Sequence, residues 1–292
     1  MTRRRDLERH RQSLHEIRDI LNSMKTLAFM ETRKLTRFLG AQQAVVESIE
    51  EVAADFLSFH GETLPEVGAT TPVYLLIGTE RGFCGSFNQA LVDHLQAALE
   101  TQTDETPLVI AVGSKLHALI ERETRAVACI GGASVAEEVS VVLNQMVKEL
   151  SSIQKSHPML TVFGLYHVGD DGIAMQKLLP PFQHQQHSPQ RYTHPPVLQL
   201  SPPQFLIELT EHYLFATLHA MLYTSLMAEN LNRVSHLENA VNHLDDKSDE
   251  LARRCSAMRQ EEIIEEIEVI LLSSGSIDER RDQSAQWPPG NR

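Results

Sequence analysis

The sequence has few cysteines, few aromatic residues and no long apolar run. Its three cysteines, Cys84, Cys129 and Cys255, are scattered, so neither a disulfide framework nor a paired metal-ligand spacing is predicted. No stretch approaches the roughly 18 uninterrupted apolar residues of a membrane span. A formal net charge of −13 argues against nucleic acid as a partner, because binding phosphates requires a basic face. These absences favour a reducing cytoplasm as the compartment.

Proline is missing from two long stretches near the ends of the chain. None occurs before Pro65, and none lies between Pro203 and Pro288. Because proline breaks helices, its absence predicts an N-terminal helix over residues 1–60 and a C-terminal helix over Phe205–Ser274. The second helix would be roughly 100 Å long at 1.5 Å per residue, which is too long for a compact domain.

Each predicted helix carries a narrow apolar seam with alternating steps of three and four residues. The first seam comprises Leu14, Ile17, Leu21, Met24, Ala28, Glu31, Leu35, Phe38, Gln42, Val45, Ile49, Val52 and Phe56. The second comprises Leu237, Val241, Leu244, Ser248, Leu251, Cys255 and Met258. Each could be the inner face of a surface helix, but seams this long exceed the core of a chain of this size. An antiparallel coiled coil of the two helices is favoured.

The segment between the helices alternates between strand and helix patterns. Apolar runs predict strands at residues 73–77, 108–112, 125–130, 160–168 and 173–179, and helices are expected at 88–99, 115–122 and 134–153. Ser134 and Glu137 have the spacing of a capping box for the last helix. The fold class is therefore α/β: a Rossmann-like alternating domain over residues 70–180, with a mostly parallel sheet covered on both faces, inserted into the coiled coil.

The remaining segments differ in composition from these elements. Residues 181–203 are rich in proline, glutamine and histidine, which predicts an extended connector. Its histidines, His184, His187 and His194, have no cysteine or carboxylate companions at a metal-binding spacing, so a solvated loop is favoured over a metal site. The C-terminal coiled-coil helix spans 204–275, and the polar tail 276–292 is expected to be flexible.

A glycine-rich segment, Gly78–Asn88, follows the first predicted strand. Such turns can cradle phosphate at a helix N-terminus, but this one lacks the lysine and serine of a P-loop. A structural turn at Gly82 and Gly85 is therefore favoured over nucleotide binding. Cys84 could act as a nucleophile, yet no partner histidine is identifiable, and a buried structural thiol is favoured. The sequence shows no catalytic constellation, and no cofactor or metal is predicted.

Several short sequence motifs together resemble those of the gamma subunit of F-type ATP synthases over nearly the whole chain. They are Ile20–Lys25 with Arg33-Lys34, Arg81–Asn88, Val112–Lys115, Glu229-Asn230 with Arg233, and Met258–Gln260 with Ile263, Glu266 and Ile270. The sequence departs from the family pattern at Ile264, Val269 and Ser256, which stand where threonine, an acid and asparagine are usual. The resemblance is therefore to a divergent, bacterial-type member.

The resemblance implies a non-catalytic central rotor stalk, which couples ion flow through a membrane ring to ATP synthesis or hydrolysis. Its implied partners are the alpha and beta subunits of the catalytic head, the epsilon subunit and the membrane rotor ring, at the cytoplasmic face of the membrane. By resemblance, Arg259 and Gln260 make polar contacts to a beta-subunit loop, and Met24 makes an apolar contact near the beta lever. Arg259 and Gln260 also lie where the seam is interrupted, because the step from Met258 to Ile263 is five residues.

Two other functions are compatible with the residues alone. A nucleotide-binding α/β enzyme would require a pocket at the strand ends near Gly82 and Gly85. A coiled-coil adaptor unrelated to rotation would require no ring-shaped partner.

Overall fold

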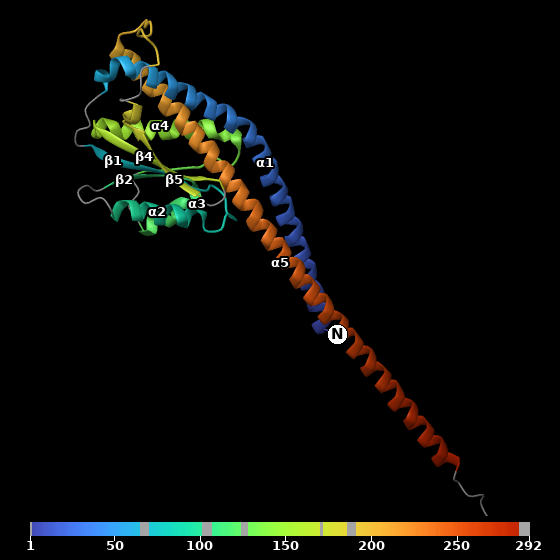
Figure 1. Ribbon diagram of the computed structural model, residues 1–292. Helices are drawn as coiled ribbons and strands as arrows, with labels where there is room; N and C mark the ends of the chain where they lie inside the picture. The colour runs from blue at the N-terminus through green and yellow to red at the C-terminus, as the bar shows by residue number, and fades with distance from the viewer. Residues whose placement is uncertain are drawn as a thin grey trace, which may run out of the picture. The chain divides into compact units, whose positions relative to one another are not determined.

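The computed structural model describes residues 2–64, 70–100, 107–123, 128–169, 172–185 and 191–285. The chain divides into two compact units, one of residues 24–237 and one of residues 1–23 with 238–292. Two long helices, α1 (Thr2–His60) and α5 (Pro202–Ala285), contribute to both units (Figure 1). The predicted mixed α/β fold with long terminal helices around a central sheet is confirmed.

The unit of residues 24–237 contains a five-stranded sheet in the order β3-β2-β1-β4-β5. The strands are β1 (Thr71–Ile77), β2 (Leu108–Val112), β3 (Ala128–Ile130), β4 (Leu160–Val168) and β5 (Gly172–Leu179). β1 to β4 are parallel, and β5 pairs with β4 in the antiparallel sense. The mostly parallel sheet was predicted correctly, although residues 125–127 of the predicted third strand lie outside the described residues.

Helices cover both faces of this sheet (Figure 1). The covering helices are α2 (Phe87–Glu100), α3 (Ser114–Glu123) and α4 (Val139–Ser156). Leu75 and Ile77 pack with α4 and α5 on one face, whereas Tyr74 and Leu76 pack with α2 and α3 on the other. Because both faces are buried, the strand reads as a continuous apolar run rather than an alternating one.

The long helices are antiparallel in each unit. In the unit of residues 24–237, the ring of Phe38 lies 5.7 Å from that of Tyr223, and the ring of Phe56 lies 4.8 Å from that of Phe205. Residues later in α1 therefore lie beside residues earlier in α5, so the two helices are antiparallel. The same holds in the other unit, where Arg4 pairs with Glu262 at 3.5 Å and Arg18 pairs with Asp245.

The seam predicted for α5 agrees with burial, whereas the seam predicted for α1 is wrong at four of its thirteen positions. Along α5, Leu237, Val241 and Leu251 are buried, and the other predicted positions are half-buried. Along α1, Ala28, Leu35 and Phe56 are buried, but four predicted positions are 44–47% exposed, and the side chain one residue later is less exposed in each case. The exposed positions are Ile17, Phe38, Val45 and Val52, and the replacing ones are Arg18, Leu39, Val46 and Ala53.

The reason for this error is that α1 packs against more than one partner. Leu39 packs against the core that includes β1 and α4 as well as α5, and Val46 packs against a third apolar cluster that includes Phe182 as well as α5. A seam whose spacing alternates three then four residues and one that alternates four then three share every seventh residue. The apolar pattern alone therefore does not decide which of the two seams is buried. The surfaces that α1 meets make that choice.

Two local predictions were also wrong. Helix α5 continues through Gly275 to Ala285, because one glycine costs a helix only about 1 kcal/mol and does not end it. The expected capping box at Ser134 does not form, because a 3₁₀ turn over Ala136–Glu138 precedes α4. The Ser134 N–H donates to the Glu138 carboxylate at 2.7 Å, whereas Glu137 pairs with Lys34.

Candidate functional site

The glycine-rich turn after β1 is closed at its base by Asn88. The Thr79 N–H donates to Asn88 Oδ1, and Asn88 Nδ2 donates to Thr79 Oγ1, both at 2.9 Å. Asn88 lies in the first turn of α2, so its side chain joins the end of β1 to the start of that helix. The segment between them is therefore held as a compact loop at the carboxyl end of the sheet.

Glu80 connects this loop to the ends of two neighbouring strands. Its carboxylate accepts hydrogen bonds from the Ser114 N–H at 2.9 Å, the Ser114 hydroxyl at 2.7 Å and the Gly132 N–H at 2.7 Å. Ser114 begins α3, where an anionic group is favourable. Although partial burial alone would raise the pKa of Glu80, these hydrogen bonds hold it below its usual value. Sequence reasoning missed this residue.

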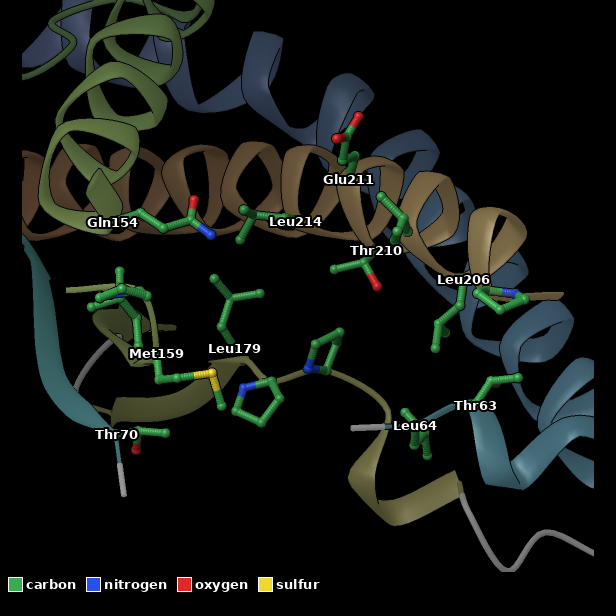
Figure 2. A pocket seen from close by; sticks show the side chains of 16 residues that line it. Thr63, Leu64, Thr70, Gln154, Met159, Leu179, Leu206, Thr210, Glu211 and Leu214 are labelled. Atoms are coloured by element: carbon green, nitrogen blue, oxygen red, sulfur yellow. The ribbon is translucent and has the colours of Figure 1, made fainter. Parts of the chain in front are cut away.

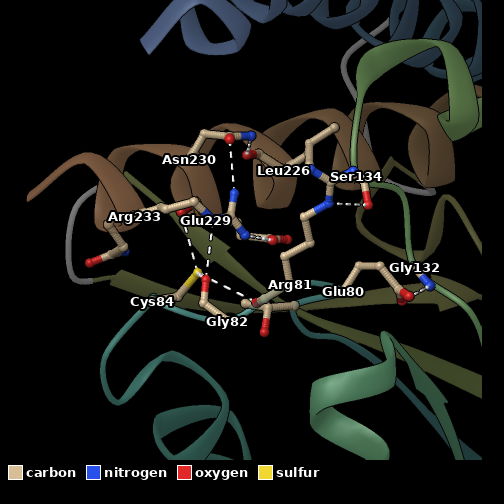
Figure 3. Close-up of polar contacts among 12 residues, drawn as sticks. Glu80, Arg81, Gly82, Cys84, Gly132, Ser134, Leu226, Glu229, Asn230 and Arg233 are labelled. Atoms are coloured by element: carbon tan, nitrogen blue, oxygen red, sulfur yellow. Dashed lines mark hydrogen bonds and ion pairs between the residues drawn. The ribbon is translucent and has the colours of Figure 1, made fainter. Parts of the chain in front are cut away.

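Helix α5 binds the loop from the other side through Glu229 and Arg233 (Figure 3). Both are almost fully buried, at 3% and 5% exposure. They form an ion pair, and Arg233 also donates to the Gly82 carbonyl at 3.2 Å and to Asn230 Oδ1 at 2.9 Å. The backbone N–H groups of Arg81 and Glu80 act on the Glu229 carboxylate to lower its pKa. We call Glu229 and Arg233 with their loop partners the α5 clamp.

The α5 clamp places a carboxylate where a phosphate cradle would need positive charge. A phosphate at such a turn binds backbone N–H groups, but here the buried carboxylate of Glu229 lies near the N–H groups of Arg81 and Glu80, which lower its pKa. Burial raises the pKa of Glu229 to about 7, while Arg233 and the two N–H groups act in the opposite direction. The spacing of four residues between Glu229 and Arg233 is typical of a helix-surface pair, and only the fold buries it.

Cys84 is a buried thiol of this loop rather than an exposed nucleophile. It is 8% exposed, and its Sγ lies 3.4 Å from the Gly82 carbonyl and 3.7 Å from the Glu229 carbonyl. Burial raises the pKa of Cys84 to about 12, although the nearby Arg233 lowers it in part. Because the thiolate is the reactive form, the site does not support nucleophilic catalysis at neutral pH.

The two glycines singled out in the loop differ in what the backbone requires. Gly85 has a φ of 59°, a left-handed conformation that favours glycine. A side chain at Gly82 would meet no atom within 4 Å, and its φ is not in the left-handed region. Phe83, which lies between them, has a φ of 64° and is 48% exposed.

Beside the loop, Met24 lines a surface depression of about 270 Å³. Its wall also contains Leu27 and Glu31 of α1, together with Arg81 and Phe83 of the loop. Leu27 is 66% exposed. The fold therefore brings Met24 to a mixed apolar and polar surface that includes the glycine-rich loop.

Arg259 and Gln260 lie on α5 in the other unit. Both side chains are exposed, and neither makes a hydrogen bond to another described residue. Their neighbour Met258 is half-buried, whereas Ile263 is 46% exposed. Apolar packing along this face of α5 is therefore lost between these two positions.

The connector histidines do not form a metal site that can be described. His194 is exposed, whereas the side chain of His184 and all of His187 lie outside the described residues. Among the described residues there is no group of three or more histidine, cysteine or acidic side chains placed to hold a metal. In the same part of the chain, no helix is long and apolar enough to cross a membrane.

Long N- and C-terminal helices, with a mostly parallel sheet inserted between them in the chain, place this protein in the class of mixed α/β proteins with long terminal helices. The family model described as ATP synthase matches residues 3–275 of this chain. The ATP synthase gamma chain of Clostridium botulinum strain Langeland is 23% identical over 274 residues, covering 91% of this chain and 95% of the relative. The Hall strain protein of the same name is 24% identical over the same shares.

Solved structures show the same fold. A chain of the Euglena gracilis mitochondrial ATP synthase rotor aligns with a TM-score of 0.58 at 17% identity, covering 90% of this chain and 99% of that one. A chain from a second Euglena structure, containing OSCP, F1 and the c-ring, aligns with a TM-score of 0.62 at 16% identity, covering 100% and 98%. This chain belongs to the ATP synthase gamma-chain family.

Proposed function

We propose that this chain is the central rotor stalk of an F-type ATP synthase. It would couple ion flow through a membrane ring to ATP synthesis or hydrolysis in a catalytic head, without carrying hydrolytic residues itself. The observation that carries the proposal is the antiparallel pairing of α1 and α5 found in each unit. Two helices wound together are stiffer than one, and stiffness is what a rotating shaft requires.

The proposal assigns a role to each part of the chain. Residues 1–60 and 204–285 form the shaft, which contacts the alpha and beta subunits. The insert, residues 70–180 with the connector 181–203, is the foot that binds the epsilon subunit and the membrane ring. The complex would therefore lie peripherally at the cytoplasmic face of the membrane. As the shaft turned, its differing faces would favour different conformations of successive beta subunits.

Three exposed or half-buried positions are the proposed contacts to the head. Arg259 and Gln260 have unused hydrogen-bonding groups on an exposed helix face, and charge-assisted bonds contribute roughly 1.5 to 3 kcal/mol each. Met24 presents a flexible apolar side chain at the depression beside Phe83. Gly82, Cys84 and Gly85 belong to the structural turn and not to a catalytic centre.

The structure favours neither alternative function. An enzyme built on the insert would need a phosphate-binding turn at the glycine-rich loop, yet the buried carboxylate of Glu229 lies beside that loop. The match of the ATP synthase family model over residues 3–275 favours the rotor over an adaptor unrelated to rotation.

The test is the double variant Arg259→Ala/Gln260→Ala, assembled with its native complex. Loss of one charge-assisted bond should reduce ATP-driven rotation-coupled turnover or assembly about tenfold or more. The matched control is Gln145→Ala/Lys148→Ala, which removes an amide and a cation from an exposed face of α4. Unchanged coupling in the first variant, or equal losses in both, would contradict the assigned contacts. Failure of the native chain to co-purify with a hexameric ATPase head would contradict the rotor itself.

A further inference from the structure

A cavity of about 520 Å³ opens on the unit of residues 24–237, away from the glycine-rich loop. It lies where the end of α4 and the end of β5 meet the first turns of α5, beside the segment that follows α1 (Figure 2). Most of its wall is apolar, formed by Met159, Leu179, Leu206 and Leu214 with several prolines. This volume lies within the roughly 300–1,000 Å³ typical of small-molecule sites.

Two polar groups on the wall have unused hydrogen-bonding capacity. The hydroxyls of Thr63 and Thr70 are already bonded, to the His60 carbonyl at 2.7 Å and to the Thr161 hydroxyl at 2.5 Å. The Thr210 hydroxyl and the Gln154 amide make no hydrogen bond to another described residue, and both point into the cavity in Figure 2. They come from different helices, α5 and α4, and so offer a donor or acceptor at two places on an apolar wall.

The charge of the wall restricts what can bind. Among the described residues that line the cavity there is no lysine, arginine or histidine, and the carboxylate of Glu211 points away from it (Figure 2). Within this described lining, an anion would find no cation to pair with, and an ammonium group would find no carboxylate facing it. Because an unpaired charge is costly to remove from water, a neutral ligand is favoured over a charged one.

We propose that this cavity is a binding site for a neutral amphipathic small molecule, one with an extended apolar body and a single hydroxyl group. The apolar body would lie against Leu179, Leu206 and Leu214, and the hydroxyl would exchange hydrogen bonds with Thr210 or Gln154. Met159 and Ile207 also line the cavity and are 50% and 60% exposed, so this part of the wall is accessible from solvent. The proposal of this binding site does not depend on the proposed function of the chain as a rotor stalk.

The probe is 1-decanol, titrated into the full-length chain labelled with ¹³C at its methionine methyl groups. Of the nine methionines, Met159 is the one among the described residues that lines the cavity, so its signal reports occupancy at this site. We expect a saturable shift of the Met159 signal with 1-decanol. Decanoate and decylammonium, which share the chain but carry a charge, should bind at least tenfold more weakly. Equal or tighter binding of either charged probe would overturn the proposal.

Variants of the wall test the assigned contacts. Thr210→Val keeps the shape but removes the hydroxyl, and it should weaken 1-decanol binding roughly two- to tenfold, the effect of one lost hydrogen bond. Thr210→Phe fills part of the cavity and should weaken binding more than tenfold. Val141→Phe adds bulk at an exposed position near the start of α4 and serves as the matched control. Unchanged binding in both Thr210 variants with their helical circular dichroism intact, or an equal loss in the control, would refute the site.

Discussion

Arg233→Met is expected to be among the most destabilising substitutions on α5. Methionine matches the length of the arginine stem and removes only the guanidinium. Arg233 is 5% exposed. Its guanidinium pairs with Glu229 and donates hydrogen bonds to the Gly82 carbonyl and to Asn230 Oδ1. Removing one partner of a buried ion pair costs about 3 to 5 kcal/mol, because the other charge is left buried without compensation. Against a total stability of roughly 5 to 15 kcal/mol, this is a large fraction.

The loss should depend on pH in a definite direction. Burial raises the pKa of Glu229 to about 7, so the folded chain holds this proton at pH values where the unfolded chain has released it. The stabilising contribution of the protonated carboxyl is complete below about pH 4.5 and is lost as pH rises through about 7. Arg233 lowers this pKa, so its removal raises the pKa further and extends the loss above pH 7. The cost of Arg233→Met should therefore be greater at pH 8.5 than at pH 6.

Urea unfolding followed by circular dichroism at the two pH values measures this cost, and hydrogen exchange of the Glu80–Gly85 backbone locates it. The double variant Arg233→Met/Glu229→Gln should recover part of the loss at pH 8.5, because a neutral amide leaves no buried charge. A cost below 1 kcal/mol, or a larger cost at pH 6 than at pH 8.5, would refute the reasoning about the α5 clamp.

Three further outcomes are expected. Gly85→Ala should destabilise by about 1 to 2 kcal/mol because of its left-handed backbone, whereas Gly82→Ala should change stability by about 0.5 kcal/mol or less, as thermal unfolding of both will show. Cys84 should react with iodoacetamide at pH 8 far more slowly than exposed Cys129 in the native chain, and equal rates would contradict its burial. Leu35→Ala should cost about 2 to 5 kcal/mol in urea unfolding, since the side chain is fully buried in the core.

The sequence by itself determined the elements of this protein and their order. The absence of proline over residues 1–64 and 204–287 was sufficient to predict two long helices, because nothing else in the chain breaks a helix so reliably. The continuous apolar runs of β1 and β2 predicted buried parallel strands. The antiparallel helix pairing followed from one seam at each end of the chain.

Only the tertiary structure decided which side chains those elements bury. The seam of α1 could follow either of two alternating patterns, and the clusters in which Leu39 and Val46 pack, formed by α5 together with other elements, chose the one that sequence apolarity did not indicate. Glu80 and Glu229 are ordinary acidic residues in the sequence. They become the anchors of the glycine-rich loop because strand ends and a helix from distant parts of the chain converge there. Burial and hydrogen bonding depend on neighbours from every element packed around a residue. A local sequence pattern contains information only about neighbours within the same element.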